Sequence, residues 1–150
     1  MTGLLHDIGQ LTLYCQRPKQ SAEALLLCIN RYDGRDHFLA EQEVFGFSHE
    51  EVGMELARAW EFPELFQQCF AHHHSVDKAD SYAKEVELLH AANVFAVLME
   101  LDSDDLLDGP PLSGFVSEYV ANDPEKIAEI RNSIEKVYFK NRVQLLDMVD

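Results

Sequence analysis

Basic residues are scarce in this sequence, which has 12 Lys and Arg against 27 Asp and Glu and a formal net charge of −15. Such a charge repels phosphate backbones and anionic membrane surfaces, and no local basic patch offsets it. Long apolar runs are also missing, since no segment approaches the ~18 residues of a membrane span, and the N-terminus does not resemble a signal peptide. We therefore expect neither a nucleic acid nor a membrane as a partner.

Cysteine is scarce as well. The sequence has three cysteines, an odd number, at Cys15, Cys28 and Cys69, and each has apolar neighbours in a helical pattern. This usage fits reduced thiols packed in a protein interior better than a disulfide framework. It predicts a cytoplasmic protein.

Sustained alternation of apolar and polar residues is absent, and apolar residues instead recur three and four positions apart. This spacing predicts an all-α fold. The length of 150 residues suits a single helical domain over residues 1–150, with about six to eight helices. No linker or repeat divides the chain.

Two helix starts are clear from local chemistry. Ser48 followed by Glu51 three residues later forms a capping box, and it opens a helix in which Val52, Leu56 and Trp60 are expected to face inward. Asp123 is suited to cap a long C-terminal helix. Pro124 would be the first residue of that helix.

The candidate chemistry of this sequence lies in its histidines and carboxylates. In "GLLHDIG" (residues 3–9), His6 and Asp7 are adjacent in an apolar helical run, so both could lean toward one ion. His49 is in the first turn of its helix, where the positive end of the helix dipole favours the neutral imidazole that a metal needs. His73 and His74 belong to a dense run of three histidines. Taken singly, each of these could also be an ordinary structural polar residue.

Two further polar residues lie on an apolar helix face. His90 and Asn93 share the inward stripe of a helix that begins near Tyr82, and an unpaired polar group there would cost ~1–3 kcal/mol. Either they form hydrogen bonds between helices, or they line the same pocket as the histidines. His72 is another candidate for that pocket.

The order of these motifs resembles the HDOD family, the HD-related output domains of bacterial signalling proteins, within the HD metal-dependent phosphohydrolase superfamily. The resemblance depends on "GLLHDIGQL", "EQEVFGFSHEEVGMELARAWEFPE", "CFAHHHSV" and "LLHAANVFAVL", which span residues 3–98. It implies a helical HD-domain-like fold and a role in signal transduction. It also implies five metal ligands, namely His6, Asp7, His49, His73 and His74.

Departures from the catalytic relatives limit what the resemblance implies. No histidine precedes His6, Asn93 stands where a late aspartate would be, Gln10 replaces a lysine and Ser75 replaces a glutamate. Four imidazoles and one carboxylate are enough for a single divalent ion, iron, manganese or zinc, but too few anionic ligands for two-metal phosphodiester cleavage. The chain also looks like the later part of a longer domain that lacks an N-terminal helical part.

Three interpretations follow. The favoured one is a regulatory domain with a degenerate metal site that has lost hydrolase activity and transmits a signal by binding a protein partner. The second is a metal-dependent phosphohydrolase acting on a phosphomonoester or a nucleotide. The third is a helical domain whose histidines are packing residues and which binds no metal.

Overall fold

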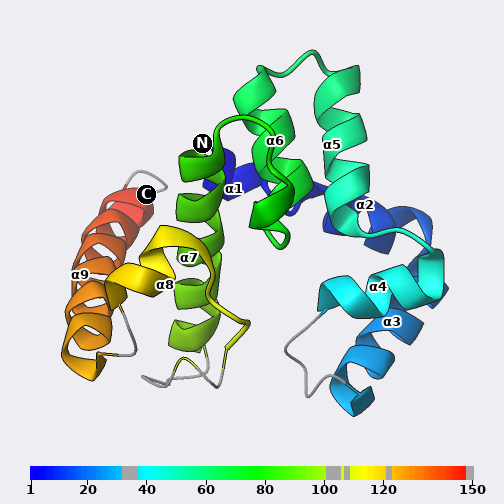
Figure 1. The fold of residues 1–150 in the computed structure, drawn as a ribbon. Coiled ribbons are helices and arrows are strands. Elements are labelled where there is room, and N and C mark those ends of the chain that lie inside the picture. Colours follow the sequence, from blue (N-terminus) through cyan, green and yellow to red (C-terminus); the bar gives the residue numbers. More distant parts are fainter. Residues whose placement is uncertain (32–36, 101–105, 107–108, 121–122, 148–150) are drawn as a thin grey trace.

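The computed structural model describes residues 1–31, 37–100, 106, 109–120 and 123–147, and in the last helix the side chains as far as residue 141. Within these ranges the regular elements are all helical, which confirms the predicted all-α class (Figure 1). The elements are α1 (Thr2–Leu5), α2 (Ile8–Gln16), α3 (Pro18–Arg31), α4 (His37–Phe45), α5 (His49–Ala59), α6 (Glu64–His72), the 3₁₀ turn η1 (Val76–Lys78), α7 (Ala83–Glu100), α8 (Gly114–Val120) and α9 (Pro124–Asp147).

The helices form a hairpin with a group of helices on either side of it (Figure 1). Helices α5 and α6 run side by side as the hairpin, and α2 packs against α5. Helices α3 and α4 pair with each other, while α7 contacts α1 and α6 on one side and α8 on the other. The start of α5 and the end of α6 therefore lie near the middle of the molecule.

Helix α7 separates two apolar cores. Its Val86 and Leu89 pack with Ala57, Cys69 and Phe70 of the hairpin. On another side, residues of α7 pack with residues of α8 and α9, in a cluster made of Ala91, Val94, Phe95, Leu98, Val116, Val120 and Ile127. A helix that is apolar on several sides is expected to be buried between layers, and α7 is.

The two predicted helix starts are confirmed. Ser48 and Glu51 form the reciprocal capping box, in which the Ser48 backbone N–H donates to a Glu51 carboxylate oxygen at 2.6 Å. At the other end of the chain, the Glu125 backbone N–H donates to Asp123 Oδ1 at 3.0 Å, ahead of the long helix α9.

Two burial predictions are wrong. Trp60 does not face inward, because it is 53% exposed, and the buried residues of α5 include Gly53 and Ala57. Small residues are buried there because α5 packs closely against its neighbours. Cys28 and Cys69 are buried thiols as expected, but Cys15 lies on an exposed side of α2; all three cysteines are free.

No helix among the described residues combines the length and the apolar character needed to cross a bilayer.

Candidate metal centre

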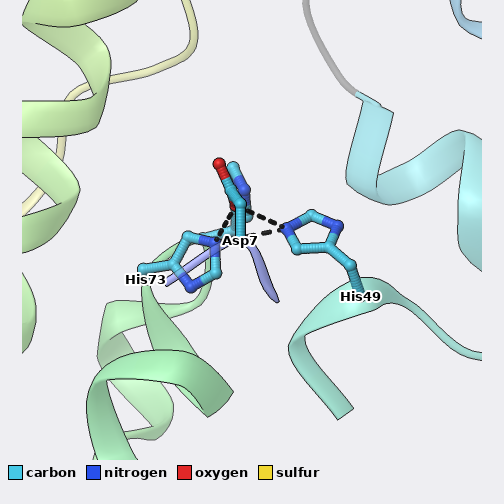
Figure 2. Close-up of side chains that lie close together, drawn as sticks. Asp7, His49 and His73 are labelled. Carbon is cyan, nitrogen blue, oxygen red and sulfur yellow. Dashed lines mark hydrogen bonds and ion pairs between the residues drawn. The ribbon is translucent and has the colours of Figure 1, made fainter. Parts of the chain in front are cut away.

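Four potential ligands from three helix ends meet in one place. Asp7 precedes α2, His49 begins α5, and His73 and His74 follow directly after the body of α6. One ligand atom from each of these residues lies within 4.8 Å of all the others. Figure 2 shows the side chains of Asp7, His49 and His73 pointing toward one another.

One glycine, Gly9, allows two of these helix ends to come together. A Cβ atom added at Gly9 would overlap the His49 carbonyl oxygen and would lie 2.7 Å from the Gly53 backbone nitrogen. Helices α2 and α5 therefore cross at van der Waals contact between their backbones, which only glycine permits at this position. Because Asp7 is two residues before Gly9, this contact brings Asp7 next to His49.

The partners of the outer ring nitrogens define the tautomers of His49 and His73. His49 Nδ1 lies 2.6 Å from Glu41 Oε2, and His73 Nδ1 lies 3.2 Å from the carbonyl oxygens of Cys69 and Phe70. Carbonyl and carboxylate oxygens only accept, so each Nδ1 carries a hydrogen and donates it. In the neutral rings, both Nε2 atoms therefore present a lone pair to the interior of the group.

The inner atoms form a nearly equilateral triangle. His49 Nε2 and His73 Nε2 are 3.2 Å apart, and they lie 3.5 Å and 3.3 Å from Asp7 Oδ1. Two lone pairs and a carboxylate oxygen at these distances repel one another unless a cation or a proton lies between them. Ligand atoms bound at 2.0–2.1 Å to one tetrahedral ion would be about 3.3 Å apart, so this triangle fits one face of such a site.

Most charge states in the group suit a metal. Burial works to raise the pKa of Asp7, but hydrogen bonds with His6 and His73 hold it well below its usual range. Burial lowers the pKa of His73, and burial together with the neighbouring imidazoles lowers that of His74 to about 2. At neutral pH, Asp7 is therefore anionic, and His73 and His74 are neutral.

His49 differs from the expectation based on the helix dipole. Burial works to lower the pKa of His49, but the hydrogen bond and the charge of Glu41, with the charge of Asp7, outweigh it and raise that pKa. The dipole argument is wrong here because a buried carboxylate contacts the ring directly. With no ion between the Nε2 atoms, a proton on His49 would relieve the same repulsion.

Two buried carboxylates beside the group were not identified from the sequence. Glu41 is 1% exposed and Glu50 is 3% exposed. Glu41 Oε2 also accepts from the His49 backbone N–H at 2.8 Å, while Glu50 accepts from the His74 N–H at 2.6 Å and from Ser75 Oγ at 3.1 Å. For Glu41 the sequence did contain a signal, because Glu41 follows His37 by four residues in a helix, where side chains meet.

His6 lies beside the four-residue group and is not part of it. Its Nδ1 donates to the Gly3 carbonyl at 2.9 Å, and its Nε2 lies 3.0 Å from Asp7 Oδ2. The His6 ring also meets the His73 ring edge-on, with centroids 4.9 Å apart. Burial works to lower the pKa of His6, but Asp7, with a contribution from Asn93, raises it.

The remaining candidates have different surroundings. His90 is buried, and its Nδ1 donates to the His73 carbonyl at 2.7 Å while its Nε2 accepts from the Ser113 backbone N–H at 3.3 Å. These are hydrogen bonds between chain segments, and His90 also lines a cavity next to His74. His72 is outside the four-residue group and interacts with the charges of Asp80 and Lys78.

Comparison with known protein families gives a match to the first half of the chain. A model of the HDOD domain matches residues 1–76, which run from α1 to the first residue of η1. This stretch contains all four residues of the candidate metal group. Searches of curated proteins and of solved structures gave no significant match. Since the matched residues make up half of the 150-residue sequence, the chain belongs to the HDOD domain family.

Proposed function

We propose that this HDOD chain is a signal-transduction domain that holds one divalent ion in a structural role, does not hydrolyse phosphoesters, and acts by binding a protein partner. The ion would be held by Asp7, His49, His73 and His74. A bound ion would supply positive charge and Lewis acidity, and it would link the ends of α2, α5 and α6.

The observation that carries this proposal is that the two buried carboxylates already accept hydrogen bonds within the protein. Glu41 uses Oε2 for the ring and the backbone of His49, and Glu50 accepts hydrogen bonds from His74 and Ser75. Asp7 is then the only carboxylate in the four-residue group. Two-metal hydrolysis requires further anionic ligands to hold a second ion, so the geometry favours a single ion.

The number of protein ligands favours a structural ion over a catalytic one. A structural zinc site is closed by four protein ligands, whereas a catalytic site has three and leaves a position for water or substrate. The group here offers three imidazoles and one carboxylate, which is four. Imidazole suits zinc and iron, and the carboxylate also suits manganese.

Exposed apolar residues on α3 support a role in protein binding. Leu25, Leu26 and Ile29 are 48%, 60% and 55% exposed, and they lie within little more than one turn of the helix. Contiguous apolar surface of this kind is typical of protein interaction sites. Helix α3 packs mainly against α4, which leaves this side of the helix toward solvent.

Elemental analysis of protein purified without a histidine tag tests the metal. We expect close to one equivalent of a divalent ion, and we expect Asp7→Ala and His73→Ala to lose it. His72→Ala is the matched control, since His72 is adjacent in sequence but outside the group. A wild-type protein that retains less than about a tenth of an equivalent after reconstitution would favour the metal-free interpretation.

Hydrolysis assays separate the regulatory interpretation from the enzymatic one. Metal-loaded protein should not turn over p-nitrophenyl phosphate, bis(p-nitrophenyl) phosphate or nucleotides. Turnover that depends on the ion and disappears in Asp7→Ala would instead establish a phosphohydrolase.

The partner is tested by comparing the proteins that co-purify with wild type and with Leu26→Glu; a partner should be lost in the variant, while the metal content stays the same.

A further inference from the structure

A cavity of about 470 Å³ lies directly beside the metal group. Its walls come from the start of α4, the segment after α6, and the segment before α8, and it shares His74 with the metal group. This volume lies within the usual range of small-molecule sites. Walls from several separate chain segments are also typical of ligand pockets.

Flat apolar surfaces make up much of the cavity wall. The Phe38 ring lies against the His74 ring, with centroids 5.7 Å apart and planes inclined by 27°. Pro110 and Pro111 add rigid apolar surface from the segment before α8. Aromatic faces of this kind bind planar rings well, because stacking contributes beyond the burial of area.

His37 presents an unpaired polar atom in the same wall. His37 Nδ1 lies 2.7 Å from Gln10 Nε2 and 3.4 Å from Glu41 Oε1, so this ring nitrogen has polar neighbours within the protein. That Nε2 is buried and has no hydrogen-bond partner among the described residues. An unpaired buried ring nitrogen is costly, so a hydrogen-bonding atom on a ligand in the cavity would stabilise it. Asp77, also in the wall, can accept from a donor.

We propose that this cavity binds a planar nitrogen heterocycle of the nucleobase type. Its ring would pack on Phe38 and the two prolines, a polar ring atom would form a hydrogen bond with His37 Nε2, and an amino group would donate to Asp77. The proposal goes beyond the signalling role above, because it names a small-molecule class as an input to the domain. It depends on neither the ion nor the protein partner.

Ligand-observed NMR on the full chain, with adenine as the probe, tests the proposal. Saturation transfer from protein to adenine is expected with both metal-free and zinc-loaded protein. Benzoate has a flat ring but no ring nitrogen or amino group, and it should bind clearly more weakly. Phe38→Ala should weaken adenine binding by about tenfold or more in a titration, since stacking on an aromatic ring is worth this much per base.

Two variants complete the experiment. His37→Phe retains a ring but removes the ring nitrogens, and it should also weaken adenine binding while leaving the thermal unfolding transition in place. Phe47→Ala is the control, because Phe47 is an exposed aromatic residue away from the cavity. The proposal is overturned if adenine shows no saturation transfer, if benzoate binds equally well, or if folded Phe38→Ala and His37→Phe both bind adenine like wild type. Metal content, measured on the same samples, reports separately on the signalling proposal.

Discussion

His49 Nε2 lies 3.2 Å from His73 Nε2, although the two residues are 24 positions apart and begin and end different helices. Both Nδ1 atoms donate outward, to Glu41 and to backbone carbonyls, so the facing nitrogens carry lone pairs in the neutral rings. Outer hydrogen bonds of this kind orient metal-bound histidines in many proteins. The metal affinity of the group should therefore depend on these outer hydrogen bonds.

Glu41→Gln should weaken metal binding by about 10- to 100-fold, because a glutamine holds the Nδ1–H of His49 less firmly than a carboxylate does. Competition with a chromophoric chelator measures this affinity. The control is Glu43→Gln on the same helix, since Glu43 pairs with Arg31 at an exposed position. Equal affinity in Glu41→Gln and wild type would contradict the role of Glu41.

Gly9→Ala should both destabilise the protein and reduce metal binding. The new methyl group would overlap the His49 carbonyl oxygen, so α2 and α5 must move apart, at a cost of about 1–3 kcal/mol in the free energy of unfolding. Urea denaturation measures the loss. Gly3→Ala is the control, because a Cβ at Gly3 would meet Leu89 only at 3.8 Å. Similar behaviour of the two variants would argue against a close crossing at Gly9.

Glu50 should make the metal-free protein less stable as the pH rises. Burial raises the pKa of Glu50 from 4.5 to about 7, against the opposing hydrogen bonds from His74 and Ser75. Between these two pH values the unfolded chain has released the proton and the folded chain has not, so the free energy of unfolding decreases with rising pH. Above about pH 7 this loss is complete.

Glu50→Gln removes this titration. The free energy of unfolding of the variant, relative to that of wild type, should therefore rise between about pH 4.5 and about pH 7 in urea denaturation with EDTA present. Glu55→Gln, an exposed site on the same helix, should track wild type across this range. A stability difference between Glu50→Gln and wild type that stays constant with pH would show that Glu50 ionises normally.

Thiol labelling should distinguish the three cysteines. Cys15 is exposed, whereas Cys28 and Cys69 are buried, and burial raises the pKa of Cys69 to about 11. Ellman's reagent should therefore modify one thiol in the native protein and all three in denaturant, since reaction needs an accessible thiolate. Cys15→Ser should abolish the native reaction; rapid labelling of a second thiol would indicate an opening of the core.

Local features of the fold could be predicted because their causes are local. The period of three and four residues produced the correct class, and the side chains of Ser48 and Asp123 cap helices through contacts within a few residues. Burial was predicted less well. Trp60 was expected inside because it shares a helical stripe with Val52 and Leu56, but beyond the first turn of α5 the buried positions are Gly53 and Ala57.

The helical class, the HDOD resemblance and the residue types that can bind a metal all follow from the order of the amino acids. Which of these residues meet depends on the folded arrangement of the helices: Asp7 joins His49, His73 and His74, while His6 lies beside them. It also placed Glu41 and Glu50 behind the imidazoles. The physical reason is that these contacts depend on how closely separate helices approach, and that approach depends on a glycine contact that no local pattern encodes.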